Sequence, residues 1–217
     1  MAVLTMHIGQ ELIFFPMISG NKIELHHVYR LCLEGDLCKT QLQHPQRVLD
    51  IGTGTGIWAI EGDIYALETS AADEFPSAEN TLTSKRVSPN VSFFIVDVTQ
   101  EWAFPMDQFD FIHVRGLSGC IENWCEFLSQ CYNHLKPGGQ VEVTEIRPRE
   151  IQGRNWDPTT GLVTVLENTG FEDIRSTSYC CPVGTWSKDP KLKEIGRLTR
   201  PQFLHGAIDS YTLAMYD

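Results

Sequence analysis

Three glycines at alternate positions, Gly52, Gly54 and Gly56, directly follow a short apolar segment at residues 48–51 that is typical of a buried parallel strand. A pattern of helical spacing begins after them at Ile57. Glycine allows positive φ angles and lets a ligand lie against bare backbone, and a helix N-terminus offers unpaired N–H groups to a carboxylate or phosphate. The spacing therefore predicts a site for a nucleotide-like cofactor at the carboxyl end of the strand.

The glycine spacing differs from the dinucleotide fingerprint G-x-G-x-x-G, whose third glycine would fall one position later. The run Asp50-x-Gly52-x-Gly54-x-Gly56 resembles motif I of class I S-adenosylmethionine-dependent methyltransferases. In that family, the acidic residue that closes the strand helps to orient the turn and the methionine end of the cofactor. The resemblance implies that Asp50, Gly52, Thr53, Gly54 and Gly56 bind S-adenosylmethionine. The alternative is a glycine-rich turn without a ligand.

Composition limits the kinds of partner. The 217 residues carry a formal net charge of −11, which argues against a surface for nucleic acid or for an acidic membrane. No segment approaches the 18 uninterrupted apolar residues of a membrane-spanning helix, and the N-terminus has no secretory leader pattern. The seven cysteines are odd in number and irregularly spaced, which favours reduced thiols and a cytoplasmic protein, with the nucleus as an alternative.

No metal site is expected. His26 and His27 are neighbours on a predicted helix and point about 100° apart, so they do not easily face one ion. Three further candidates, Cys120, Cys125 and Cys131, have offsets of five and six residues, which are poor for a shared metal. These cysteines are interpreted as core or surface thiols.

Strand-like and helix-like segments alternate along the chain. Beyond residues 48–51, strands are expected at 91–96, 109–114, 141–146 and 174–181, and helices at 22–34, 121–135 and 162–166. Residues 12–15 are open to interpretation as an edge strand or a loop, and residues 208–215 as a helix or a strand. The pattern predicts one α/β domain over 1–217, with an N-terminal extension and helix (1–44) and a Rossmann-like core (45–217). Its mostly parallel sheet has helices on both faces.

The segment after the glycine turn has two interpretations. Apolar residues at helical spacing favour a helix from Ile57 to Glu74, ended by Pro76, although Gly62 lies inside it. The alternative is a second strand that begins at Ile64 and ends at Glu68, which shortens the helix to about two turns. We favour the long helix.

Several stretches, in order, resemble the fungal LaeA-like methyltransferases of secondary metabolism. They are residues 48–61, 72–79, 89–91, 109–115, 117–119, 135–139, 182–186 and 188–193. The resemblance implies S-adenosylmethionine as cofactor and a small-molecule acceptor in secondary-metabolite biosynthesis. It also implies that Asp97 faces the adenine amino group, with Val98 beside the ring.

The chain departs from this family in two places. The family's second strand ends in an acid that grips the ribose hydroxyls, but residues 80–86 contain no acid, so Glu68 or Glu79 would have to substitute. The family's substrate cap is shortened to residues 147–160. These departures favour an alternative function, a catalytically degenerate homologue that acts as a regulator or partner protein.

Two further candidates, His113 and Arg115, lie at the carboxyl end of the strand around 109–114, where open α/β sheets bind ligands. Arg115 is expected to hold the cofactor carboxylate or a substrate anion, with a structural ion pair as the alternative. Methyl transfer needs little beyond positioning, so His113 is the candidate base only for acceptors that must lose a proton. Glu145 is expected to face the cleft or the helix layer, and Trp186 to line a pocket or to pack.

Overall fold

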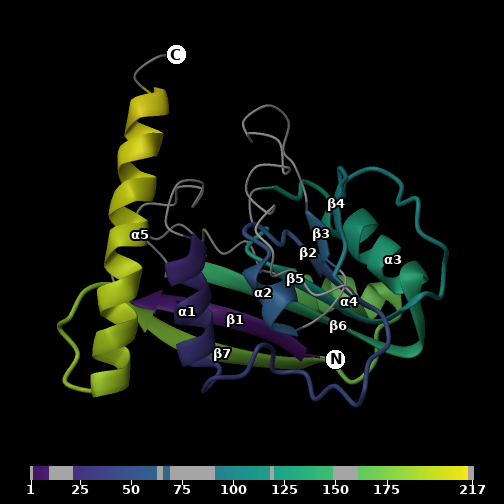
Figure 1. Ribbon diagram of the computed structural model, residues 1–217, viewed down its shortest axis with the longest axis horizontal. Helices are drawn as coiled ribbons and strands as arrows, with labels where there is room; N and C mark the ends of the chain where they lie inside the picture. The colour runs from purple at the N-terminus through teal and green to yellow at the C-terminus, as the bar shows by residue number, and fades with distance from the viewer. Residues whose placement is uncertain are drawn as a thin grey trace.

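The computed structural model describes residues 2–9, 22–62, 66–68, 91–117, 120–148 and 161–214. In this part of the chain, seven strands form one sheet in the order β4-β3-β2-β5-β6-β1-β7, and every pairing is parallel (Figure 1). The strands are β1 (Ala2–Gly9), β2 (Val48–Ile51), β3 (Ala66–Glu68), β4 (Phe93–Ile95), β5 (Phe109–Arg115), β6 (Leu135–Pro148) and β7 (Arg175–Pro182). The predicted parallel α/β sheet is confirmed.

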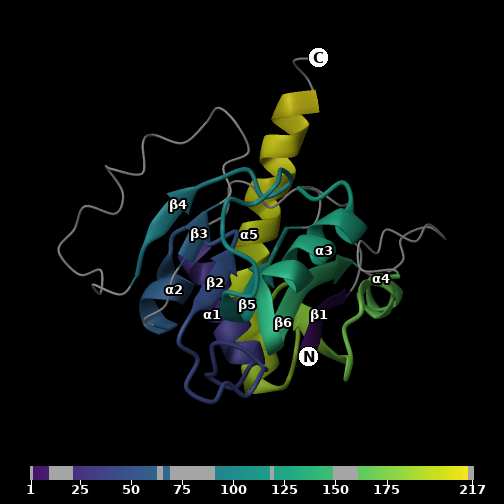
Figure 2. The ribbon, with the colours of Figure 1, turned by 90° about the vertical axis from the view of Figure 1, so that its right-hand side faces the viewer.

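Helices cover both faces of the sheet, as expected. The helices are α1 (Lys22–Cys32), α2 (Ile57–Gly62), α3 (Trp124–His134), α4 (Leu162–Thr169) and α5 (Pro190–Ala214). Figure 2 shows α1 and α2 on one side of the sheet and α3 and α4 on the other. The described helices include none that is long and apolar enough to cross a lipid bilayer.

Successive side chains of the central strands point to opposite faces of the sheet. Leu49 and Ile51 join the main apolar core with α3 and α4, whereas Val48 packs with Trp58 of α2 and with Phe111. Buried polar residues interrupt the apolar sequence of these strands, among them Asp50 of β2 and His113 of β5.

The expectation of a long helix after the glycine turn is wrong. The helix α2 ends at Gly62, and β3 pairs with β2 through Asp50 with Ala66 and Ile51 with Leu67. Glycine is a poor helix former, and the strand gains backbone hydrogen bonds from β2 on one side and β4 on the other. The alternative interpretation is therefore correct, and the strand that follows the glycine turn ends in an acid, Glu68.

Further differences concern the ends of the chain. We did not expect β1, which lies between β6 and β7. The helical interpretation of the C-terminal segment is confirmed, but α5 begins much earlier than expected, at Pro190. The predictions for residues 12–15, for Glu79 and for the shortened cap around 149–160 lie outside the described residues.

Candidate functional site

The glycine turn at the carboxyl end of β2 is built from left-handed backbone. Gly52, Gly54 and Gly56 have φ angles of +75°, +57° and +72°, which confirms the predicted need for positive φ. A Cβ atom at Gly52 would lie 2.6 Å from Cδ2 of Leu117, and one at Gly56 would lie 2.7 Å from Cε1 of Phe93. Side chains therefore close the underside of this turn at Gly52 and Gly56, where a Cβ atom has no room.

Beneath the turn, Asp50 of β2 and His113 of β5 form a buried pair. Oδ1 of Asp50 lies 2.7 Å from Nδ1 of His113, and the two residues are 2% and 1% exposed. The indole ring of Trp58 stacks on the imidazole at a centroid distance of 3.8 Å and an interplanar angle of 3°. With its ring enclosed in this way, His113 is suited to position Asp50 and not to take a proton from an acceptor.

Two buried polar atoms at the turn lack a partner. Oδ2 of Asp50 and Oγ1 of Thr53 make no hydrogen bond within the described structure. Buried polar atoms in folded proteins are nearly always hydrogen-bonded, to protein, water or a ligand. The structure thus brings together Asp50, Thr53 and the three glycines, which are the residues that the sequence singled out first.

The other predicted contact residues follow β4, two strands away along the same carboxyl edge. Oδ1 of Asp97 accepts hydrogen bonds from the hydroxyl of Thr99 at 2.7 Å and from its N–H at 2.9 Å, and these bonds lower the pKa of Asp97. The Asp97 side chain is exposed, whereas Val98 packs into the main core beside Trp102. Asp97 is open to a ligand, but Val98 faces inward.

Arg115, the last residue of β5, meets a polar cluster supplied by α1 and α2. Its Nη2 atom lies 3.3 Å from Nδ1 of His26, and its guanidinium carbon lies 4.6 Å from the centroid of the Tyr29 ring. Nε2 of His26 lies 3.3 Å from Oε2 of Glu61, which also pairs with Arg30. We call these five residues the rim cluster, because they lie next to the glycine turn. The carbonyl oxygen of Arg115 is 3.5 Å from the position that a Cβ atom of Gly52 would take.

The histidine of the rim cluster is a neutral connector. Burial lowers the pKa of His26, and the Arg115 cation lowers it further, against the opposing effect of Glu61. A neutral imidazole satisfies both contacts when Nε2–H donates to Glu61 and Nδ1 accepts from Arg115. His26 thereby fixes the guanidinium of Arg115 without adding a charge.

Two buried polar atoms of the rim cluster, the hydroxyl of Tyr29 and Nε of Arg30, make no hydrogen bond within the described structure. The hydroxyl of Tyr29 lies 3.8 Å from the position that a Cβ of Gly116 would take. Burial raises the pKa of Tyr29 well above its usual value, so the hydroxyl keeps its proton and can donate a hydrogen bond.

Other sequence candidates have structural positions. Oε1 of Glu145 accepts a hydrogen bond of 2.8 Å from the N–H of Leu117, which anchors the segment after β5. Trp186 is 64% exposed. All seven cysteines are free thiols, and Sγ of Cys32 lies 3.5 Å from Sγ of Cys181. Within the described ranges, no three potential ligands gather as a metal site.

The sequence analysis missed the contribution of α1. His26, Tyr29 and Arg30 have the spacing of one helix face, i, i+3 and i+4, and two of them are almost fully buried. Polar residues on an otherwise apolar helix face are a signal of a buried polar network. That signal was overlooked because His26 was considered only as a metal ligand.

Comparisons with known proteins agree with this geometry. Residues 25–176 match a family described as a methyltransferase domain. The chain is 32% identical, over 226 aligned positions and 88% of its length, to the methyltransferase pytC of Aspergillus terreus. It is also 32% identical, over 70% of its length, to the secondary metabolism regulator LAE1 of Cochliobolus heterostrophus. The chain spans 66% of the length of the first relative and 57% of the second.

A solved structure shows the same fold. The crystal structure of the [4+2]-cyclase SpnF superposes with a TM-score of 0.54 at 24% identity, over 72% of this chain and 61% of that one. At this identity the match supports the Rossmann-like arrangement of sheet and helices.

Proposed function

This chain belongs to the methyltransferase-domain family, and we propose that it transfers a methyl group from S-adenosylmethionine to a small-molecule acceptor in fungal secondary metabolism. The observation that carries the proposal is the glycine turn with its two unpartnered buried oxygens, Oδ2 of Asp50 and Oγ1 of Thr53. Bare backbone beside unsatisfied polar atoms fits a polar ligand that approaches the main chain closely.

The residues around the turn have distinct roles in this proposal. Gly52, Gly54 and Gly56 present the backbone to the cofactor, and Thr53 and Asp50 lie beneath its methionine end. His113 holds Asp50 in place from the neighbouring strand.

The ribose and adenine are assigned to the ends of the next two strands. Glu68 ends β3, directly after Leu67, which pairs with Ile51 at the foot of the glycine turn. This position suits a carboxylate that accepts hydrogen bonds from the ribose hydroxyls. Asp97 follows β4 and is exposed toward solvent, where it would accept from the adenine amino group. Val98 is assigned a place beneath the adenine through its backbone, since its side chain packs inward.

S-adenosylmethionine supplies a methyl group on a sulfonium that is already a good leaving group. Most of the catalysis therefore comes from the way in which the chain holds the acceptor in line with that methyl group. We assign no proton transfer to His113, because its ring is enclosed between Asp50 and Trp58.

Calorimetric titration with S-adenosylmethionine and S-adenosylhomocysteine tests the proposal. We expect saturable one-site binding of both, and release of S-adenosylhomocysteine when a low-molecular-mass extract of a fungal culture is added. Absence of binding to the folded wild-type protein would contradict the proposal at its first step.

A regulatory role is the second candidate, because one of the relatives above is named a secondary metabolism regulator. This candidate requires a protein partner, and it is compatible with an intact cofactor site. Cofactor binding without turnover of any component of the metabolite extract would favour it over small-molecule methylation.

A further inference from the structure

The rim cluster holds a half-buried cation that has no carboxylate partner. Among the described residues, no ion pair involves Arg115, whereas Arg30 of the same cluster pairs with Glu61. Arg115 is instead held by two uncharged groups, the imidazole of His26 and the face of the Tyr29 ring. A guanidinium fixed by neutral neighbours keeps its charge and most of its donors for another acceptor.

The hydroxyl of Tyr29 is an independent sign of a ligand at the same place. Tyr29 is 2% exposed, and its hydroxyl finds no partner in the described structure. The ring that carries this hydroxyl packs under the guanidinium of Arg115, and the hydroxyl lies beside Gly116, the next residue along the chain. A phenol donor and a guanidinium fork therefore face the carboxyl edge of β5, where ligands of open α/β sheets bind.

Building on the function proposed above, we propose that Arg115 and Tyr29 form a subsite for a ligand carboxylate. One carboxylate oxygen accepts from the guanidinium of Arg115, and the other accepts from the hydroxyl of Tyr29. His26 is a positioning residue, since it holds Arg115 and touches the carboxylate only through it.

The net charge of the rim cluster favours a carboxylate over a phosphate as the ligand group. Arg30 and Arg115 are cations, Glu61 is an anion and His26 is neutral, so these side chains carry one positive charge in excess. The buried carboxyl of Glu145, which accepts from the N–H of Leu117, also acts on Tyr29 from outside the cluster. A carboxylate carries one negative charge and neutralises that excess, whereas a phosphate monoester carries about two negative charges. In a chain with a net charge of −11, the guanidinium of Arg115 is the group that would retain an anion.

Two ligands have this chemistry, the amino-acid end of the cofactor and an acidic acceptor. Calorimetry distinguishes them in two arms. The first compares S-adenosylhomocysteine with its analogue that lacks the α-carboxylate. The second compares 4-hydroxybenzoate with 4-hydroxybenzamide, each titrated into protein saturated with S-adenosylhomocysteine.

We expect the wild-type protein to prefer the carboxylate ligand by at least tenfold in one arm, and that arm identifies the source. Arg115→Gln should abolish the preference, and Tyr29→Phe, which keeps the ring under the guanidinium, should reduce it severalfold. Arg197→Gln is the matched control, because it removes a cation of α5 that pairs with Glu194 outside the rim cluster. Far-ultraviolet circular dichroism of each variant verifies folding.

A preference that survives in Arg115→Gln would overturn the subsite, as would equal binding of acid and neutral ligand in both arms. The function proposed above fails separately, if the wild-type protein binds neither S-adenosylmethionine nor its product. In that case the second arm, repeated without the product, still tests the subsite.

Discussion

Asp50 and His113 lie side by side on neighbouring parallel strands, and their contact of 2.7 Å is buried under the glycine turn. Breaking one side of a buried polar pair usually costs about 3–5 kcal/mol, because the remaining group loses its partner. We expect Asp50→Ala to lower the free energy of unfolding by about 3 kcal/mol. Asp50→Asn, which keeps an oxygen for Nδ1–H of His113, should cost about 1 kcal/mol. Urea unfolding measures both, and equal losses would contradict the hydrogen-bonded role of Asp50.

Substitutions at Gly54 can distinguish the effect of backbone conformation on folding from the effect of a side chain on cofactor binding. The φ angle of Gly54, +57°, lies in the left-handed region, which asparagine tolerates and β-branched residues do not. We expect Gly54→Asn to fold with little loss of stability but to bind S-adenosylmethionine at least tenfold more weakly, since a side chain then projects from the turn. Gly54→Val should also unfold more easily, by at least about 1–2 kcal/mol. Unchanged affinity in the folded Asn variant would place the cofactor elsewhere.

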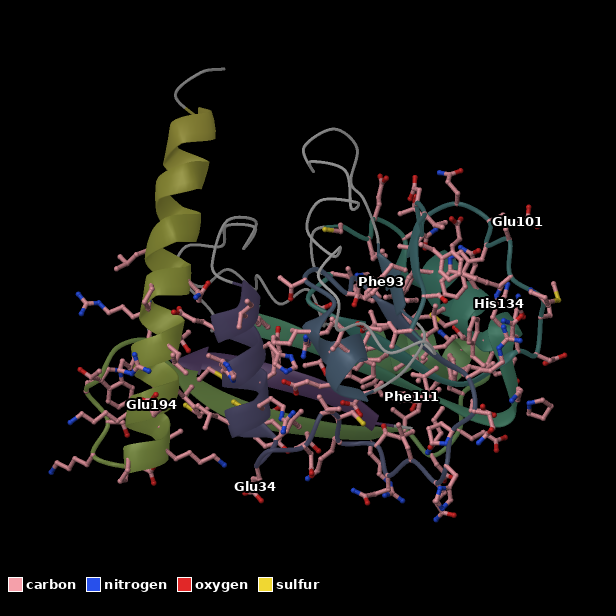
Figure 3. The ribbon with its side chains drawn as sticks, viewed as in Figure 1. Glu34, Phe93, Glu101, Phe111, His134 and Glu194 are labelled. Atoms are coloured by element: carbon pink, nitrogen blue, oxygen red, sulfur yellow. The ribbon has the colours of Figure 1, made fainter. Side chains whose placement is uncertain are left out.

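The acid at the end of β3 is the test of ribose binding. A hydrogen bond that involves a charged group contributes about 1.5–3 kcal/mol, and each 1.4 kcal/mol is tenfold in affinity. Glu68→Gln should therefore weaken S-adenosylmethionine binding by roughly ten- to a hundredfold without changing stability. Glu194→Gln on α5 provides a control, since Figure 3 shows Glu194 on the far side of α1 from Phe93, whose ring closes the underside of the turn. Wild-type affinity in Glu68→Gln would mean that another acid holds the ribose.

The carboxylate of Asp110 predicts a pH dependence of stability. Burial raises its pKa, but the bond of 2.6 Å from Lys136 and the N–H groups of Arg47 and Gln46 outweigh burial and lower the pKa below 3.8. A lowered folded-state pKa contributes stability above the unfolded-state pKa, and the contribution is lost as the pH falls through the folded-state value. Asp110→Asn should thus cost about 0.5–1 kcal/mol at pH 7, with the difference from wild type closing below about pH 4. A difference between Asp110→Asn and wild type that does not narrow at all as the pH falls below about 4 in urea unfolding would rule out this origin.

Gly196 lies where α5 crosses the loop after β7. The N–H of Gly184 donates to the carbonyl of Gly196 at 2.9 Å, and a Cβ at Gly196 would overlap the carbonyl oxygen of Gly184. Alanine in a helix is normally about 1 kcal/mol better than glycine, so a loss of stability in Gly196→Ala would show that the close approach outweighs helix propensity. We expect a net loss of at least about 1 kcal/mol in thermal unfolding. Lys193→Ala, an exposed change on the same helix, should be neutral.

Local signals were sufficient for most of the fold. The apolar run at Phe109–Arg115, the strand at Arg175–Pro182 and the glycine that caps α4 at Gly170 are close to their expected places. The segment after the glycine turn was misjudged because its apolar residues fit both a helical and a strand period. Pairing of β3 between β2 and β4 decided the outcome, and no local pattern records that pairing.

The candidate site also has one part that the sequence predicts and one part that it does not. The glycine turn, Asp50 and Thr53 are adjacent in sequence, so their proximity follows from one turn. The rim cluster joins Arg115 to His26, 89 positions away, and this separation exceeds the reach of any spacing rule. Only the packing of α1 against the sheet shows that the two belong to one site.

The packing of α1 also bears on the order in which the nascent chain matures. The apolar side of α1 is buried with Cys181 and Ile195, and Glu24 at its start accepts a hydrogen bond from Gln202, 178 residues later. At about 5–20 residues translated per second, these partners leave the ribosome on the order of ten seconds or more after α1. The glycine turn and its strand contacts have their partners well before that moment. A ribosome-bound chain can therefore form the glycine turn before Tyr29 packs with Cys181 and Ile195, so the subsite of Arg115 and Tyr29 is completed only after α5 has been made.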